Sequence, residues 1–161
     1  MFRVFHTRFF ATIFFCAIAS PSALSEVRAT ADVGKLTLSN EAVAATWSVQ
    51  NGSLQWQSLT NHFTRAALSL DDDVFALAPR EGPVVHSTDM RIIAQPVIDP
   101  MPESTTSPRA ADHLPGRRIR VELSDPSGNV RVTWSAMLRE GANYIREEVT
   151  IQATQQPFPL V

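Results

Sequence analysis

Alternation of apolar and polar side chains at every second position constrains this chain more than any other feature of its sequence. The alternation recurs from Leu36 to Ile151, whereas no stretch of a dozen residues holds the period of an amphipathic helix. In residues 43–49, for example, the two valines, an alanine and Trp47 fall on one face. The chain is therefore predicted to be all-β. Two sheets with one apolar face each would bury those faces against one another, which gives an antiparallel two-sheet β-sandwich.

The expected strands are separated by recognisable turns. Asn51-Gly52 tolerates the positive backbone angles of a tight type I′ turn, so the strands on either side of it are predicted to pair antiparallel. Three strands that form a meander are predicted at residues 118–123, 130–138 and 144–153. Further strands are predicted at residues 35–38, 43–49, 54–56, 65–70, 74–77 and 91–98. Pro96 lacks a ladder donor and places the last of these at a sheet edge.

Residues 99–116 differ in composition from the rest of the chain. They contain four prolines among serine, threonine and alanine, a mixture that sustains no ladder and buries little apolar surface. We expect one long exposed loop there. The predicted organisation is a signal peptide over residues 1–25, a flexible segment over 26–34 and one sandwich domain over 35–161.

The first 25 residues have the layout of a signal peptide. Arg3 and Arg8 precede an apolar run at residues 9–19, and Ala23 and Ser25 fit a cleavage site. The run of about 11 residues is well short of the roughly 20 that cross a bilayer. We predict cleavage after Ser25 and a secreted or periplasmic product with no membrane association after cleavage. A retained N-terminal anchor is the alternative.

Cysteine content and charge narrow the functional classes. Cleavage would remove Cys16, the only cysteine, so no disulfide, thiolate metal site or cysteine nucleophile is expected. About 135 residues remain, enough for one domain with its own core. Without Arg3 and Arg8, 12 basic residues stand against 16 acidic ones with no basic stripe, which excludes a nucleic-acid binder.

Aromatic and acidic residues are the candidates for a carbohydrate site in this sequence. Trp47, Trp56 and Trp134 could stack on sugar rings, but each is in phase with the apolar positions of its own strand, which favours the core. Glycoside hydrolysis needs two facing carboxyl groups. Glu147 and Glu148 are neighbours on a predicted strand and would point to opposite faces. No catalytic residue is therefore assigned.

Metal and cofactor sites find little support in the sequence. His62, His86 and His113 are far apart and lack the spacing that directs two imidazoles at one metal. Asp71 to Asp73 supply oxygen ligands of the kind calcium takes, yet no glycine-centred loop accompanies them, and a solvated turn is the simpler interpretation. No phosphate-binding loop and no nucleophile elbow is present. No metal and no cofactor is predicted.

Two segments carry a resemblance to a known family. The stretch Gly141-Ala-Asn-Tyr-Ile-Arg-Glu-Glu-Val-Thr-Ile-Gln-Ala153 lies between Val132-Thr-Trp134 and Pro157-Phe-Pro, and the opening stretch begins with Leu36-Thr-Leu-Ser-Asn40. Together they resemble the N-terminal β-supersandwich of bacterial alpha-galactosidase-like glycoside hydrolases, a domain related to galactose mutarotase.

The resemblance implies a carbohydrate-associated domain that precedes and supports a catalytic (β/α) barrel. The barrel and its two catalytic aspartates are missing from this chain, so no position here inherits a catalytic role. We expect either a fragment of such a hydrolase or a domain that acts alone as a sugar-binding module. Carbohydrate is the expected partner.

If a sugar contact exists, exposed polar strand ends and loops are the reasonable places for it. Tyr144 and Arg146, on the outward face of the last strand, are the predicted carbohydrate-binding residues, together with the loop from Pro100 to Pro115. Two alternatives remain open. One is a structural or protein-interaction domain of the bacterial envelope, which pairs through a sheet edge and binds no sugar. The other is a self-contained mutarotase-like enzyme, which would need histidine and carboxylate groups facing one cleft.

Overall fold

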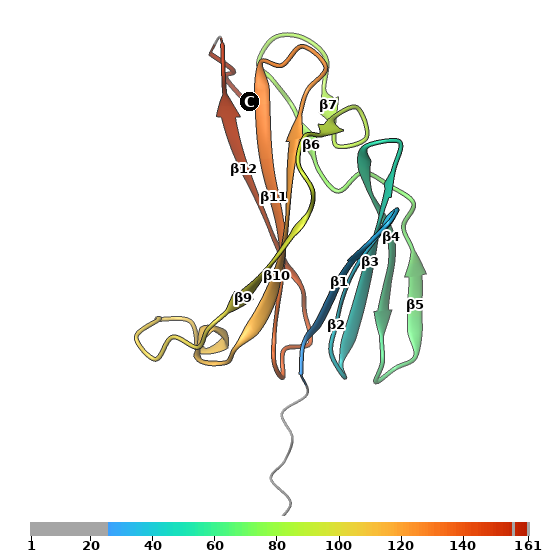
Figure 1. The fold of residues 1–161 in the computed structure, drawn as a ribbon, viewed down its shortest axis with the longest axis vertical. Coiled ribbons are helices and arrows are strands. Elements are labelled where there is room, and N and C mark those ends of the chain that lie inside the picture. The colour runs from blue at the N-terminus through green and yellow to red at the C-terminus, as the bar shows by residue number, and fades with distance from the viewer. Residues whose placement is uncertain (1–25, 156, 161) are drawn as a thin grey trace, which may run out of the picture.

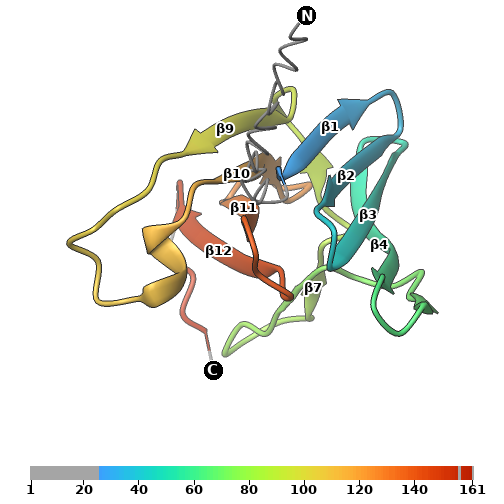
Figure 2. The ribbon, with the colours of Figure 1, turned by 90° about the horizontal axis from the view of Figure 1, so that it is seen from below.

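The computed structural model describes residues 26–155 and 157–160, so the predicted signal peptide at residues 1–25 lies outside the described residues. The described chain is an antiparallel all-β sandwich, as the alternation predicts, with two five-stranded sheets and a small two-stranded one (Figures 1 and 2). Within these ranges no helix has the length and apolarity needed to span a membrane.

The first sheet is a meander in which each strand pairs with the next along the chain. Its strands are β1 (Arg28–Asp32), β2 (Lys35–Ser39), β3 (Val43–Gln50), β4 (Ser53–Asn61) and β5 (Ala66–Ser69). The turn between β3 and β4 has φ of 53° at Asn51 and 79° at Gly52, which confirms the predicted hairpin. A bulge in the β3–β4 pairing leaves Gln57 unpaired and sets Trp56 opposite Trp47.

The prediction of a flexible segment at residues 26–34 is wrong, because β1 pairs along its whole length with β2. Ala29 lies opposite Leu38, Val27 is buried, and Gly34 closes the turn with φ of 80°. The alternation in β1 rests on small alanines, which give a weak hydrophobic signal in the sequence.

In the second sheet, one strand pairs with a long strand on one side and with two short strands on the other. Its spatial order is β12 (Arg146–Ala153), β11 (Val130–Arg139) and β10 (Gly116–Ser124), followed by β8 (Arg91–Ile92) and β9 (Val97–Met101), which both pair with β10. The meander at the carboxyl end is thereby confirmed. The single strand predicted at residues 91–98 is instead two short strands, separated by a break that includes Pro96.

The prediction of one loop over residues 99–116 is also wrong at both ends. β9 continues to Met101, Gly116 already pairs in β10, and a short 3-10 helix, η1 (Ala110–His113), lies between them. Pro100 is tolerated in β9 because β9 is an edge strand and pairs only with β10. The remaining two-stranded sheet consists of β6 (Ala76–Leu77) and β7 (Val85–His86).

Tryptophan side chains join the two sheets in the core. Trp47 of β3 and Trp134 of β11 are fully buried, and their ring centroids lie 5.1 Å apart at an interplanar angle of 70°. Trp56, which is partly buried, packs on Trp47 with a centroid distance of 4.9 Å. The prediction that these tryptophans belong to the core is confirmed, because edge-to-face packing of this kind fixes one sheet against the other.

One side of the sandwich is less well covered than the rest. All four residues of β5 are exposed, and Leu68, which pairs with Leu59 across to β4, is 58% exposed. On the opposite sheet Val149 of β12 is exposed although it pairs with the buried Trp134. Apolar side chains that face inward at these two edge strands therefore remain in contact with solvent.

Candidate functional site

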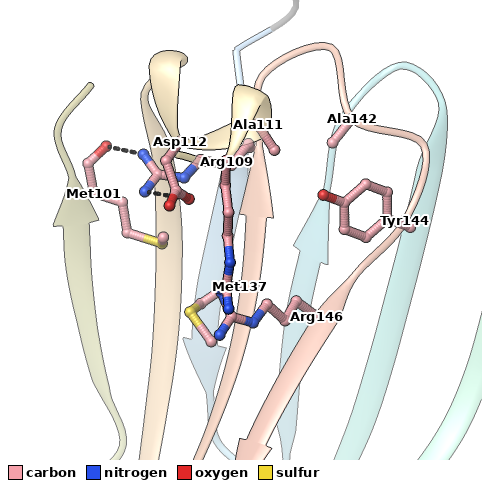
Figure 3. Close-up of a pocket in the computed structure, with 9 residues that line it drawn as sticks. Met101, Arg109, Ala111, Asp112, Met137, Ala142, Tyr144 and Arg146 are labelled. Atoms are coloured by element: carbon pink, nitrogen blue, oxygen red, sulfur yellow. Dashed lines mark hydrogen bonds and ion pairs between the residues drawn. The ribbon is translucent and has the colours of Figure 1, made fainter. Parts of the chain in front are cut away.

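A pocket of about 190 Å³ lies on the outer face of the second sheet, where the segment between β9 and β10 folds over the strands (Figure 3). Met137 of β11 points to this outer face, yet it is only 7% exposed. The pocket is lined by side chains that include Arg109, Asp112, Met137, Arg139, Tyr144 and Arg146.

Arg139 fixes the segment that forms one wall of the pocket. Its Nη1 donates to the carbonyl oxygens of Pro102 at 2.9 Å and Leu114 at 2.7 Å, and its Nη2 lies 3.3 Å from Oδ1 of Asp112. The side chain is only 14% exposed. A guanidinium that satisfies several carbonyls at once acts as a clamp, so Arg139 holds the wall in place.

Asp112 is the carboxylate of the pocket. The Ser107 hydroxyl donates to its Oδ2 at 2.8 Å. That hydrogen bond lowers the pKa of Asp112 below its usual value, and the positive charges of Arg139, Arg109 and Arg146 lower it further against a raising effect of burial. Asp112 is therefore ionised at neutral pH and can accept hydrogen bonds from a ligand.

The structure brings both predicted binding residues, Tyr144 and Arg146, to this one pocket. Tyr144 precedes β12 and does not belong to it, so its placement on the last strand is a small error, and the residue is 54% exposed. Arg146 opens β12, pairs across the ladder with Met137, and forms an ion pair with Glu148. Arg109 and Asp112 lie within the Pro100 to Pro115 loop that the sequence also indicates for a sugar contact, although neither residue was singled out. Arg139 was missed, because no local pattern links it to residues 144–146.

Glu147 occupies the opposite face of the same strand, as its position next to Arg146 and Glu148 predicts. Its Oε1 accepts a hydrogen bond of 3.2 Å from the indole Nε1 of Trp47. Burial raises the pKa of Glu147 to about 7, against the lowering effect of the indole groups of Trp47 and Trp134. The Nε1 of Trp134 is buried and has no well-formed hydrogen bond of its own. Glu147 therefore keeps its proton to a higher pH than an exposed glutamate does.

A second, more open pocket of about 400 Å³ adjoins this carboxyl group between the sheets. Its lining includes Trp56, Leu59, Asn143, Tyr144 and Glu147. Tyr144 therefore stands at the boundary between the two pockets. Glu147 and Glu148 make separate contacts, with Trp47 and Arg146 respectively, and do not face one another across a common space.

The Asp71 to Asp73 segment has a structural use. Asp73 accepts hydrogen bonds from the Thr88 hydroxyl at 2.8 Å and the Thr88 backbone at 3.2 Å, and its Oδ2 lies 2.6 Å from Nδ1 of His86. These bonds tie the segment that precedes β6 to the end of β7 and the residues that follow it. No cluster of three or more possible metal ligands occurs within residues 26–155 and 157–160.

The fold and the site define this chain as a β-sandwich protein with a basic pocket on the outer face of one sheet. Comparison of the chain with models of protein families, with curated proteins and with solved structures gives no match.

Proposed function

We propose that the chain is a non-catalytic carbohydrate-associated domain of a secreted glycoside hydrolase of the alpha-galactosidase-like kind, and that it binds sugar at the outer-face pocket. The observation that carries the proposal is the exposed ring of Tyr144 beside guanidinium groups and one carboxylate. The link to a glycoside hydrolase rests on the sequence resemblance, and secretion rests on the N-terminal pattern.

Sugar recognition needs an aromatic face and fixed polar groups. A tyrosine ring packs against the apolar face of a pyranose, while its hydroxyl remains available for hydrogen bonds. Arg146 and Arg109 supply donors, and Asp112 supplies acceptor oxygens for sugar hydroxyl groups. The volume of about 190 Å³ is smaller than pockets for drug-sized ligands and fits a single sugar unit.

The same pocket supports a binding role better than a hydrolytic one. Among the described residues of its lining, Asp112 is the one carboxylate, and it is already held by Arg139 and Ser107. Hydrolysis by the usual route needs a second carboxyl group across the scissile bond. A mutarotase-like reaction would need an acid and a base in one cleft, and within residues 26–155 and 157–160 no histidine lines either pocket.

Replacing Tyr144 with alanine is expected to weaken the binding of galacto-oligosaccharides at least about fivefold, because one aromatic stacking contact contributes roughly 1 kcal/mol or more. Isothermal titration of the purified chain measures this directly. Phe63→Ala is the matched control, since Phe63 is 71% exposed in the turn between β4 and β5, away from the pocket. A wild-type chain that gives no heat with any galactoside would refute the proposal.

A second candidate function is a structural or protein-interaction domain. It is supported by the exposed edge strand β5 and by the uncovered apolar residues Leu68 and Val149. Unpaired strand edges accept a further strand from another chain. This function requires no sugar ligand, so the titration just described also separates the two.

A further inference from the structure

Positive charge exceeds negative charge in the outer-face pocket. Its described lining residues include three guanidinium groups, those of Arg109, Arg139 and Arg146, and a single carboxylate, that of Asp112. Arg139 is committed to Asp112 and to backbone carbonyl groups, and Arg146 forms an ion pair with Glu148. Within the part of the chain that the structure describes, the guanidinium group of Arg109 forms no ion pair or side-chain hydrogen bond.

The arrangement of the two outer arginines is the key geometric feature. The side chains of Arg109 and Arg146 extend from different elements toward Met137 at the floor of the pocket (Figure 3). Two cations directed at one place repel each other unless an anion lies between them. The methionine side chain offers no negative charge, and the two nearby carboxylates, Glu148 on Arg146 and Asp112 on Arg139, offset only two of the three guanidinium charges. The site is therefore complementary to a ligand that brings an anionic group.

We propose that the pocket takes an acidic saccharide, with the sugar ring against Tyr144 and its carboxylate between Arg109 and Arg146. This assignment rests on the proposed carbohydrate-binding function and narrows its ligand class to sugars of the uronic acid kind. Guanidinium groups match a carboxylate in a planar, two-point geometry and are weakly hydrated, so they recognise it at a modest desolvation cost. The carboxylate of Asp112 repels a second negative charge on the side of the pocket that the segment between β9 and β10 forms.

The ligand test uses three saccharides that share one ring stereochemistry and differ at one substituent. They are a galacturonic acid trimer, its methyl ester and the neutral galactose trimer with the same linkage. We expect the acid to bind at least about tenfold more tightly than the ester, and this ratio to fall when the salt concentration is raised from roughly 20 to 200 mM. The fourth arm is inorganic sulfate at equal ionic strength. Sulfate at the same concentration as the trimer is expected not to compete with it for the pocket.

The variant test compares the loss of an arginine that lines the pocket with the loss of an arginine elsewhere on the same sheet face. Arg109→Gln is expected to reduce the preference for acid over ester to less than about threefold, because one of the two cations is lost. Arg120→Gln is the matched control, since Arg120 lies on the same sheet face but reaches Asp99 of β9 at 3.6 Å, outside the pocket. Circular dichroism of both variants checks that they retain the fold.

The outcomes distinguish the acidic-sugar assignment from the broader sugar-binding function. Equal binding of the acid, the ester and the neutral trimer, all abolished by Tyr144→Ala, would overturn the acidic-sugar assignment while the sugar-binding function stands. Competition by sulfate as strong as that by the trimer would show a simple anion site and overturn the saccharide part. No binding of any saccharide would remove the proposed function and this inference with it.

Discussion

Replacing Trp134 with alanine is expected to lower the free energy of unfolding by about 3–5 kcal/mol. Trp134 is 0% exposed and packs edge-on against Trp47 of the opposite sheet. Its removal leaves a cavity at the point where the sheets meet, and neighbouring side chains on paired strands relax only in part. Chemical denaturation followed by circular dichroism measures the change.

Two companion variants make this prediction specific. Trp134→Phe keeps most of the apolar volume and removes an indole N–H that is buried without a well-formed hydrogen bond, so it is expected to cost less than half as much as the alanine variant. Phe63→Ala, at a residue 71% exposed, is expected to change the free energy of unfolding by less than about 0.5 kcal/mol. A loss below about 1 kcal/mol for Trp134→Ala would contradict the inter-sheet packing described above.

Replacing Glu147 with glutamine is expected to remove a loss of stability that the wild-type chain suffers as the pH rises. In the unfolded chain this carboxyl group titrates near 4.5, whereas burial raises the pKa in the folded chain to about 7. Below pH 4.5 both states hold the proton and the full stability is present. Between pH 4.5 and 7 only the unfolded state releases the proton, so stability falls with rising pH and stays reduced above 7.

The size of this effect follows from the same two values. A shift from 4.5 to about 7 corresponds to at most about 3 kcal/mol, and partial exposure of the side chain reduces our expectation to roughly 2 kcal/mol. We therefore expect the wild-type chain to lose roughly 2 kcal/mol relative to Glu147→Gln between pH 5 and pH 8. Urea denaturation at a series of pH values measures this difference.

Glu148→Gln is the control for the pH series, because Glu148 is exposed on the other face of β12 and pairs with Arg146. It is expected to keep the wild-type slope between pH 5 and pH 8. The lowered pKa values of Asp73 and Asp112 act in the opposite sense, since they remove stability as the pH falls below about 4. Identical slopes for the wild-type chain and Glu147→Gln would show that this carboxyl group is not buried beside the tryptophans.

The strands that the sequence predicted well are those with large side chains in alternation. Residues 43–49 and 130–138 carry tryptophan and branched residues on one face, and Asn51-Gly52 marks a turn with positive φ at both positions. β1 was missed because its alternating apolar residues are alanines: Ala29, opposite Leu38, is only partly buried, and Ala31 is exposed. The predicted strand ended at residue 98 and not at the end of β9, because Pro100 indicates a loop unless the strand is known to lie at a sheet edge.

Only part of the pocket could be predicted from the sequence. Tyr144 and Arg146 are close in the chain, and an exposed strand end is a reasonable place for binding residues. Arg109 and Asp112 reach the same place only because Arg139, from another strand, holds the intervening segment by hydrogen bonds to its carbonyl groups. The raised pKa of Glu147 could not be predicted from the sequence either, since it depends on the packing of the two sheets.

The most direct test of the proposed sugar site is an amide chemical-shift titration of the isotope-labelled chain with a galacturonic acid trimer. Binding at the outer-face pocket predicts the largest shifts at Arg109, Asp112, Met137, Tyr144 and Arg146, with the strands β1 to β4 little affected. Shifts centred on the first sheet, or no shifts at saturating saccharide, would contradict the assignment of this pocket as the carbohydrate-binding site.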